Sequence, residues 1–409
     1  MPTPKLRFKD ENGQEFPEWI KVPFTSIADV RDGTHDSPKY HKYGFPLITS
    51  KNLSSSGKID FSNVNFISEN DYLNINKRSK VDIGDIIFGL IGTIGRPAIV
   101  QQEGFAIKNV ALIKPNVDLV NNKFLYQLIS SDSFNKLLEF LRSGGNQKFV
   151  SLGLLREMNF YLPELEEQHK IAEFLSTVDE KVEVLEKKLE ALNSLKKGFM
   201  QKIFSQELRF KDDSGQDFPE WKTKCLGEIS ERITRKNSNS ETDIPLTISA
   251  EYGLVNQIEY FNKQIASKDL SKYFLLEKGE FAYNKSYSKG YDFGVIKRLE
   301  KYQNGALSSL YICFNVINQD CDFMMYYFDS LKWYKNMPEI CQEGARNHGL
   351  LNCSVKEFFT IELELPSSKE EQRKIAEFLS AFDEKIEAVK RQVEAMKQVK
   401  KGLLQQMFV

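Results

Sequence analysis

Residues Glu167–Lys181 read EQHKIAEFLSTVDEK, and residues Glu371–Lys385 read EQRKIAEFLSAFDEK. They belong to a longer internal repeat, in which residues 168–205 align with residues 372–409 and 19 of 38 positions are identical. The offset is 204 residues, which is far longer than the repeats of solenoid proteins. The chain is therefore a duplicated unit rather than a repeat array.

The repeated stretches predict two long α-helices, each with a narrow apolar stripe. Apolar residues recur at alternating spacings of four and three, a period typical of coiled coils, and Lys196 and Lys400 take the same stripe position in the two copies. Neither helix can bury such a stripe alone, so we expect the two to pack on each other. The predicted interface residues are Ile171, Leu175, Val178, Val182, Leu185 and Leu189 in the first copy and Ile375, Leu379, Phe382, Ile386, Val389 and Val393 in the second.

The direction of the two helices is left open by the sequence, because the long segment between them can return the chain to either end. We favour an antiparallel coiled coil, in which a pseudo-twofold axis relates the two halves of the chain. A helix of ~40 residues is roughly 60 Å long at 1.5 Å per residue. The run Asp179–Lys181 and its copy Asp383–Lys385 lie beside the stripe, and we expect both on a solvated helix face.

A second repeat precedes each variable part of the chain. Leu6–Trp19 reads LRFKDENGQEFPEW and Leu208–Trp221 reads LRFKDDSGQDFPEW, with 11 of 14 positions identical. The blocks that follow these openings share little sequence. The repeated segments thus form a common scaffold, and the two blocks, called heads below, differ from each other. The predicted domains are head one (residues 1–162), a first spacer helix (163–205), head two (206–365) and a second spacer helix (366–409).

The two heads have the same order of predicted elements. Strand-like runs such as Phe45–Thr49 and Asp85–Ile91 precede a helical stretch in head one, and Ile244–Ile248 and Leu310–Phe314 precede one in head two. A polar, glycine-containing turn and a strand ending in Leu-Pro then lead into each long helix. The predicted fold class is therefore α/β (α+β) heads joined by two long helices, one fold used twice.

Composition excludes several classes of protein. The chain has 409 residues and a formal net charge of −1, and no apolar run is long enough to cross a bilayer. Its N-terminus lacks a signal peptide, so we expect a soluble, cytoplasmic protein. Five cysteines form no CxxC pair and there are four histidines, so neither a metal site nor a disulfide is predicted. P-loop, HExxH, GxSxG and GxGxxG motifs are absent, and we expect no catalytic centre.

These features together resemble the specificity (S) subunits of type I restriction–modification systems. The resemblance rests on the paired helical motifs with their Lys-Lys-Gly tails, on the Leu-Arg-Phe…Pro-Glu-Trp openings and on Asp32-Gly33-Thr34-His35 with Gly84-Asp85-Ile86 in head one. Head two has no Asp-Gly-Thr-His match, and its Gly279-Glu280-Phe281 matches Gly84-Asp85-Ile86 only loosely.

The resemblance implies that each head is a target-recognition domain for one half of a bipartite site in double-stranded DNA. It implies that the helices act as a spacer and dock two methyltransferase (M) subunits that methylate adenine, with restriction (R) subunits joining the complex. This chain would then bind no cofactor, since S-adenosylmethionine would belong to M and ATP and Mg to R.

Residue type and loop position suggest which side chains contact DNA, because Arg, Lys, Asn and Gln read base edges or hold phosphates. The candidates are Thr34, His35, Lys39, Tyr40, Arg96, Asn146, Gln147 and Lys148 in head one and Arg235, Lys285, Tyr287, Lys289, Arg346, Asn347 and His348 in head two.

One alternative is a non-catalytic adaptor with two protein-binding heads on a coiled coil. The near-zero net charge favours it, because nucleic-acid affinity rests largely on contacts between basic side chains and phosphates. The polar, aromatic-containing loops favour DNA.

Overall fold

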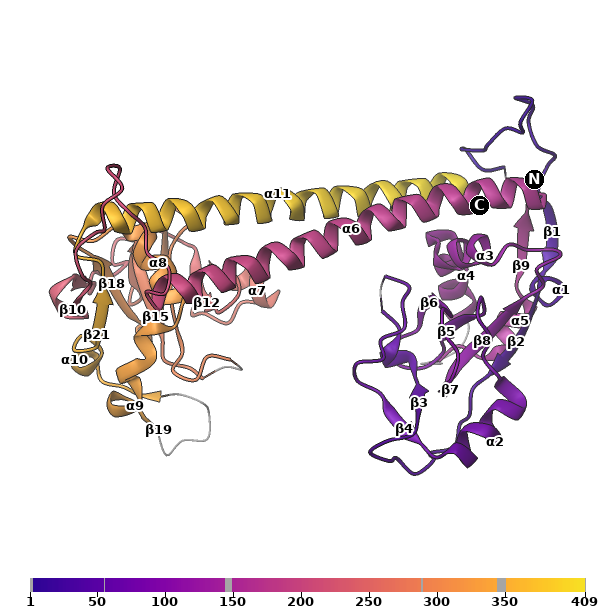
Figure 1. Cartoon of the computed structure of the whole chain (residues 1–409), viewed down its shortest axis with the longest axis horizontal. Helices are drawn as coiled ribbons and strands as arrows, with labels where there is room; N and C mark the ends of the chain where they lie inside the picture. Colours follow the sequence, from indigo (N-terminus) through magenta and orange to yellow (C-terminus); the bar gives the residue numbers. More distant parts are fainter. Residues whose placement is uncertain (1–2, 55, 144–148, 288–289, 344–350, 409) are drawn as a thin grey trace. The chain divides into compact units, whose positions relative to one another are not determined.

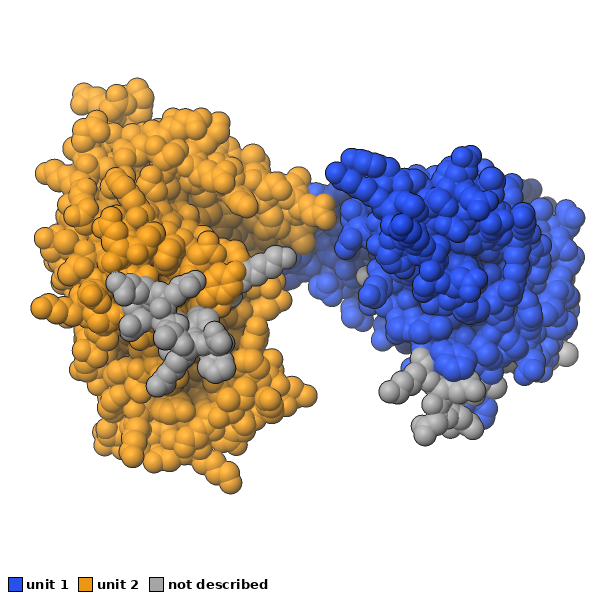
Figure 2. All heavy atoms as spheres, turned by 90° about the horizontal axis from the view of Figure 1, so that it is seen from below, with its two compact units in different colours: residues 1–188, 389–409 blue, residues 189–388 orange. Residues whose placement is uncertain are grey.

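The computed structural model describes residues 3–54, 56–143, 149–287, 290–343 and 351–408. Two compact units make up the chain: unit 1 contains residues 1–188 and 389–409, and unit 2 contains residues 189–388 (Figure 2). The boundaries between the units fall inside the two long helices. Each head is thus one body with parts of both helices, and the predicted division into heads and separate spacer helices stays a prediction.

Head one consists of short elements (Figure 1). They are β1 (Ile20–Pro23), α1 (Phe24–Ile27), β2 (Ala28–Asp32), β3 (Phe45–Ile48), η1 (Ser50–Asn52), β4 (Asn65–Ile67), α2 (Glu69–Ser79), β5 (Ile86–Gly89), β6 (Gly95–Ile99), β7 (Ala106–Ile107), β8 (Val110–Pro115), α3 (Asn122–Ser130), α4 (Asp132–Ser143), α5 (Leu152–Glu157) and β9 (Asn159–Leu162).

Two sheets organise head one. The central sheet has the antiparallel order β2-β8-β5-β6, and a smaller sheet has the order β4-β3-β7, in which β3 and β7 are parallel. Residues of β5 alternate between two cores: Ile86 and Phe88 pack with α3, and Ile87 packs with the smaller sheet. The central sheet is therefore buried on both faces. A separate antiparallel pair, β1 with β9, joins the two ends of the head.

Head two repeats this plan. Its elements are β10 (Lys222–Cys225), η2 (Leu226–Glu228), β11 (Ser230–Arg232), β12 (Pro245–Ser249), β13 (Gly253–Asn256), α7 (Gln257–Phe261), β14 (Phe274–Glu277), β15 (Phe281–Asn284), β16 (Val295–Arg298), β17 (Asn304–Leu307), β18 (Ile312–Val316), α8 (Cys321–Asp329), η3 (Lys332–Asn336), α9 (Met337–Ile340), β19 (Gln342–Glu343), β20 (Leu351–Asn352), α10 (Val355–Phe358) and β21 (Glu362–Leu365).

The central sheets of the two heads correspond strand by strand. The central order β11-β18-β15-β16 matches β2-β8-β5-β6, and β10 pairs with β21 as β1 pairs with β9. Phe281 and Tyr283 face one core while Ala282 faces the other, the same alternation as in β5. The expectation of one fold used twice is confirmed. The clearest differences are the additional strand β14 and the short α7 in place of α2.

Two long helices follow the heads: α6 spans Leu165–Phe204 and α11 spans Lys369–Met407. Within unit 1, Asp179 pairs with Lys400 and Glu186 pairs with Lys397, so residue numbers rise on one helix as they fall on the other. The favoured antiparallel arrangement is confirmed. All of the predicted interface residues are buried or half-buried. Buried are Ile171, Leu175, Leu185, Ile375, Leu379, Ile386, Val389 and Val393, and half-buried are Val178, Val182, Leu189 and Phe382.

The lysines that interrupt the stripe form ion pairs across the helices. In unit 1, Lys400 Nζ lies 2.5 Å from Asp179 Oδ1, and in unit 2, Lys196 Nζ lies 2.6 Å from Asp383 Oδ1. The expectation of a solvated face is confirmed for Glu180, Lys181, Glu384 and Lys385, which are exposed, whereas the two aspartates are half-buried and paired with lysines. A polar pair at a stripe position favours one register, because any slip leaves its charges without partners.

The repeated Leu-Arg-Phe…Pro-Glu-Trp opening is tied to the start of the long helix. Arg7 donates to Glu167 from Nε and Nη2 at 3.0 and 2.6 Å, and Trp19 Nε1 donates to the same carboxylate at 3.2 Å. In unit 2, Arg209 and Trp221 make the same hydrogen bonds to Glu371. These contacts give a physical reason for the matching repeats, since each opening holds its own helix.

The far end of each helix completes the core of the other head. In unit 1, Leu404, Met407 and Phe408 of the C-terminus are buried in the core of head one, with Phe408 packed against Trp19 and Phe124. In unit 2, Ile203 and Phe204 take the same role in head two. Each core therefore contains side chains from both long helices.

Candidate nucleic-acid interface

The loop after β2 carries Thr34 and His35 and is held firmly. Thr34 N donates to Ile107 O at 3.0 Å, and Asn109 N donates to Thr34 O at 3.2 Å. The His35 ring lies between two side chains, with Nε2 2.9 Å from Asp32 Oδ2 and Nδ1 2.9 Å from Asn109 Oδ1. Both candidates thus occupy fixed positions at the corner between the two sheets.

This loop forms one wall of a groove of about 540 Å³. Residues 33–38 lie on one side, and Asp71, Asn74, Ile75 and Arg78 of α2 lie on the other. The spacing of the α2 residues places them on one helix face. The groove is polar and open at the surface of head one, which suits the edge of a nucleic acid better than a small apolar ligand.

Two further candidates in head one are exposed on the chain between the sheets. Lys39 and Tyr40 lie between β2 and β3, with Tyr40 49% exposed, and Tyr43 in the same stretch is 77% exposed. The Lys42 ammonium lies 5.6 Å from the centre of the Tyr43 ring. This stretch offers basic and aromatic side chains together, a combination that suits contacts with phosphates and bases.

Arg96 stands at the tight turn between β5 and β6. A side chain at Gly89 would place its Cβ 2.1 Å from the Thr93 carbonyl oxygen, and Gly95 has φ +83°, so the turn requires glycine at both positions. Arg96 itself adopts φ 50° and is exposed. These two glycines therefore mark the turn that joins β5 to β6.

The same turn lies beside the segment that follows the polar loop of head one. Val150 N donates to Leu90 O at 3.0 Å, and Ile91 pairs with Phe149. The candidates Asn146, Gln147 and Lys148 lie outside the described residues. The fold thus brings Arg96 and the end of a sequence-distant loop to one corner of the head.

Head two has the same arrangement at the corresponding corner. Leu351 N donates to Lys285 O at 2.9 Å, just as Val150 donates to Leu90 in head one. Lys285 is half-buried and Tyr287 is 56% exposed. The candidates Lys289, Arg346, Asn347 and His348 lie outside the described residues.

Arg235 has a strong acidic partner. Its Nη2 lies 2.5 Å from Glu280 Oε2 and 3.5 Å from Glu277 Oε1, and its side chain is 38% exposed. Its charge is therefore largely compensated within head two, and a contact with DNA remains a prediction for this residue.

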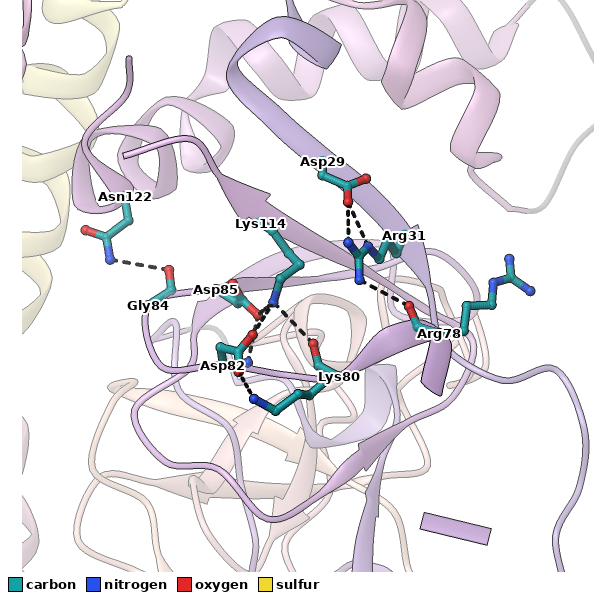
Figure 3. Close-up of polar contacts among 9 residues, drawn as sticks. All are labelled: Asp29, Arg31, Arg78, Lys80, Asp82, Gly84, Asp85, Lys114 and Asn122. Atoms are coloured by element: carbon teal, nitrogen blue, oxygen red, sulfur yellow. Dashed lines mark hydrogen bonds and ion pairs between the residues drawn. The ribbon is translucent and has the colours of Figure 1, made fainter. Parts of the chain in front are cut away.

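The Gly84-Asp85-Ile86 motif has a scaffold role. Lys114 donates to Asp85 at 2.5 Å and to Asp82 at 2.8 Å, while Lys80 also donates to Asp82 (Figure 3). Burial raises the pKa of the Asp85 carboxyl, whereas hydrogen bonds from Lys114 and Lys80 hold the pKa of Asp82 below its usual range. Asp85 and Lys114 are well shielded and satisfy each other, which gives this motif a structural role.

Gly279-Glu280-Phe281 is the structural counterpart of this motif in head two. Glu280 accepts a hydrogen bond from Glu277 N at 2.7 Å, as Asp85 accepts one from Asp82 N at 2.8 Å. Arg235 in head two supplies the cation that Lys114 supplies in head one. The loose sequence match therefore reflects the same turn with a different ion pair.

Among the described residues no group of His, Cys, Asp or Glu is arranged to hold a metal ion. The five cysteines are free thiols. No helix in the described ranges is both long enough and apolar enough to cross a membrane.

Sequence reasoning missed the basic end of α2. Asn74, Lys77 and Arg78 are exposed there, and Asn74 and Arg78 line the groove with the Thr34–His35 loop. The available signal was an amphipathic stretch whose polar face ends in Lys-Arg, but the sequence alone did not place it next to the Asp-Gly-Thr-His motif.

Two heads of one fold, each presenting polar loops and each built with parts of both long helices, define a two-headed recognition protein. The model of the type I restriction modification DNA specificity domain matches residues 41–194 and 219–398, and the chain belongs to this family. It is a non-catalytic specificity subunit of a type I restriction–modification system, and it recognises DNA sequence.

Relatives match all or part of the chain. A Methanocaldococcus jannaschii protein provisionally named the type I restriction enzyme MjaX specificity subunit is 25% identical, over 97% of this chain and 96% of its own length. The EcoBI specificity subunit of Escherichia coli is 29% identical over 41% of this chain and 36% of its own length. The S subunit of a type I system from M. genitalium has a similar fold, with a TM-score of 0.57 at 18% identity, covering 100% of this chain and 99% of that one.

Proposed function

We propose that each head reads one half of a bipartite site in double-stranded DNA and that the paired helices set the gap between the half-sites. Two M subunits dock on the helices and methylate adenine, and R subunits join the complex for restriction. This chain binds no cofactor; S-adenosylmethionine belongs to M, and ATP and Mg belong to R. The complex acts in the cytoplasm.

The observation that carries this proposal is the contrast between matched scaffold contacts and unlike heads. The Arg7–Glu167 and Arg209–Glu371 pairs have the same geometry, yet the chain after β2 is rich in basic and aromatic residues and its counterpart after β11 has no aromatic residue. Such a molecule presents two different binding surfaces on one repeated scaffold. Two DNA half-sites of different sequence fit this arrangement, because each head can bind its own half-site.

Family membership disfavours the adaptor alternative, whose main support was the near-zero net charge. A near-zero net charge is unusual for a protein that binds DNA alone, because affinity rests largely on phosphate contacts. The proposed M subunits supply additional basic surface. We therefore expect tight DNA binding only when M is present.

An internal head exchange tests the proposal. Residues 24–158 of head one are replaced by residues 226–361 of head two, which keeps the β1–β9 ladder and both helices. The grafted head meets similar side chains in its new place. Met407 and Phe408, which complete the core of head one, align in the repeat with Ile203 and Phe204, which complete the core of head two. The measurement is genome-wide adenine methylation in cells that express the chain with its M partner.

We expect the natural chain to give a split motif with two different half-sites. The exchanged chain then gives a motif in which both half-sites are the one read by head two, with the gap unchanged. The reverse exchange gives the other half-site twice and serves as the matched control. A split motif that does not follow the exchanged head would contradict the proposal.

Lengthening the spacer is expected to change only the gap. Seven residues that continue the apolar stripe are inserted between Lys188 and Leu189, and seven more between Ala388 and Val389. Each helix then gains about 10 Å, which corresponds to roughly three base pairs of duplex. The methylated motif should keep both half-sites and gain this spacing. Insertion in one helix alone is the control, since it breaks the register and should abolish methylation.

A further inference from the structure

Helix α2 in head one has one packed face and one polar face. Tyr72 stacks on Phe45 with ring centres 4.0 Å apart, and Ile75 packs on the same small core. Asn74, Lys77 and Arg78 are exposed. The first turn is capped by Ser68, whose hydroxyl accepts from Asp71 N. The polar face is therefore presented by a helix that cannot rotate.

The end of α2 is bound to β2 through two arginines. Arg31 Nη1 donates to the Arg78 carbonyl oxygen at 3.3 Å (Figure 3), and the Arg78 guanidinium pairs with Asp32. The Asp32 side chain is only 9% exposed, and it also holds His35. A single buried carboxylate thus orients both Arg78 and the Thr34–His35 loop across the groove.

Arg78 nevertheless remains reachable, because its side chain is 69% exposed. A guanidinium has five donors in a planar fork, and one Nη bonds to Asp32, so other donors remain for a ligand. Asn74 Oδ1 accepts from Lys77 Nζ at 2.9 Å, which leaves the amide N–H donors of Asn74 for a ligand. Lys108 donates to Ser37 of the opposite wall at 2.7 Å and adds positive charge next to the groove.

The acidic groups that face the groove are largely engaged within the head. Asp32 bonds to Arg78 and His35, and Asp71 accepts from the Ser68 hydroxyl at 2.7 Å. Asp36 donates its backbone N–H to Thr34 Oγ1 and has an exposed side chain at the rim. The donors that the groove offers come chiefly from Arg78 and Asn74, and they match the acceptors of guanine and adenine in the major groove of DNA.

We propose that α2 is a sequence-reading helix of head one: Arg78 and Asn74 contact base edges across this groove, and Lys77 contacts phosphate. The proposal deepens the proposed function and rests on it. Among the described residues of head two, the helix in the place of α2 is α7, which has five residues and no basic residue. The two heads thus read their half-sites with different elements of the same fold.

Variants of the full chain, each assembled with the M partner, test this assignment. Methylation motifs are mapped, and affinity for a duplex that carries the natural motif is measured at several salt concentrations. We expect Arg78→Ala and Asn74→Ala each to relax the preference at one position of the half-site read by head one. Each should weaken binding on the order of 10- to 100-fold. Arg78→Lys keeps the charge but should not restore the base preference, since Lys lacks the planar fork.

Lys77→Ala should weaken binding to all sequences alike and lower the salt slope by about 1. The matched control is Lys136→Ala, which removes an exposed lysine from α4 of the same head. Asn74→Ala keeps the test valid if Arg78→Ala disturbs the fold, because Asn74 makes no contact with Asp32.

The proposal is overturned if the Asn74→Ala and Arg78→Ala variants show the same half-site for head one, and the same affinity, as the Lys136→Ala control. It is also overturned if Arg78→Ala weakens every sequence equally without changing the motif, since that result assigns Arg78 to phosphate. Absence of a chain-dependent split motif with the natural chain is a different result and contradicts the proposed function instead.

Discussion

Replacing Phe408 by alanine is expected to destabilise head one by about 3–5 kcal/mol, the usual cost of truncating a buried phenylalanine. Phe408 lies far from head one in the sequence, yet it is 2% exposed and packs against Trp19 and Phe124. The expected consequence is loss of the half-site read by head one, while head two keeps its structure.

Amide hydrogen exchange of the full chain measures this effect locally. Protection of β5 and β8 should fall in the Phe408→Ala variant, and protection of β15 and β18 should not change. Phe204→Ala should give the mirror result, since Phe204 packs in the core of head two. Val399→Ala is the control, because Val399 is 52% exposed on the same helix. Equal loss of protection in both heads after Phe408→Ala would contradict this assignment.

Replacing Arg7 by alanine is expected to cost about 3–5 kcal/mol, because it leaves a buried carboxylate without its cation. The Glu167 side chain is 0% exposed, and Arg7 is 12% exposed. Trp19 Nε1 would remain the only partner of this carboxylate among the hydrogen bonds described above. The opening segment and the start of α6 should then loosen together.

The matched variant is Arg209→Ala, which removes the same contact from Glu371 in head two. Lys9→Ala is the control, since the Lys9–Glu15 pair is exposed on both sides and should contribute less than about 1 kcal/mol. Combining Arg7→Ala with Glu167→Gln should recover part of the loss, because the neutral amide carries no uncompensated charge. The free energy of unfolding of each variant is measured in urea, with amide hydrogen exchange as the readout for each head. A cost for Arg7→Ala as small as that for Lys9→Ala would refute this role.

Much of the scaffold could be predicted because its signals are local. The 3.5-residue stripe identified both long helices and their interface residues, and the repeated openings identified the duplication. The strand predictions Phe45–Thr49 and Asp85–Ile91 correspond to β3 and β5, since short apolar runs between turns are typical of buried strands. The candidate interface was predicted less completely. Thr34 and His35 lie in the polar groove, whereas Arg235 is paired with Glu280.

The sequence by itself determined the duplicated plan, the two helices and the shared order of elements in the heads, because period and repetition are read directly along the chain. Only the tertiary structure decided that Phe408 belongs to the core of head one, that Lys400 fills the stripe by pairing with Asp179, and that Arg78 shares a carboxylate with His35. These contacts join residues distant in sequence. Their geometry depends on how the chain returns on itself, which local periodicity does not encode.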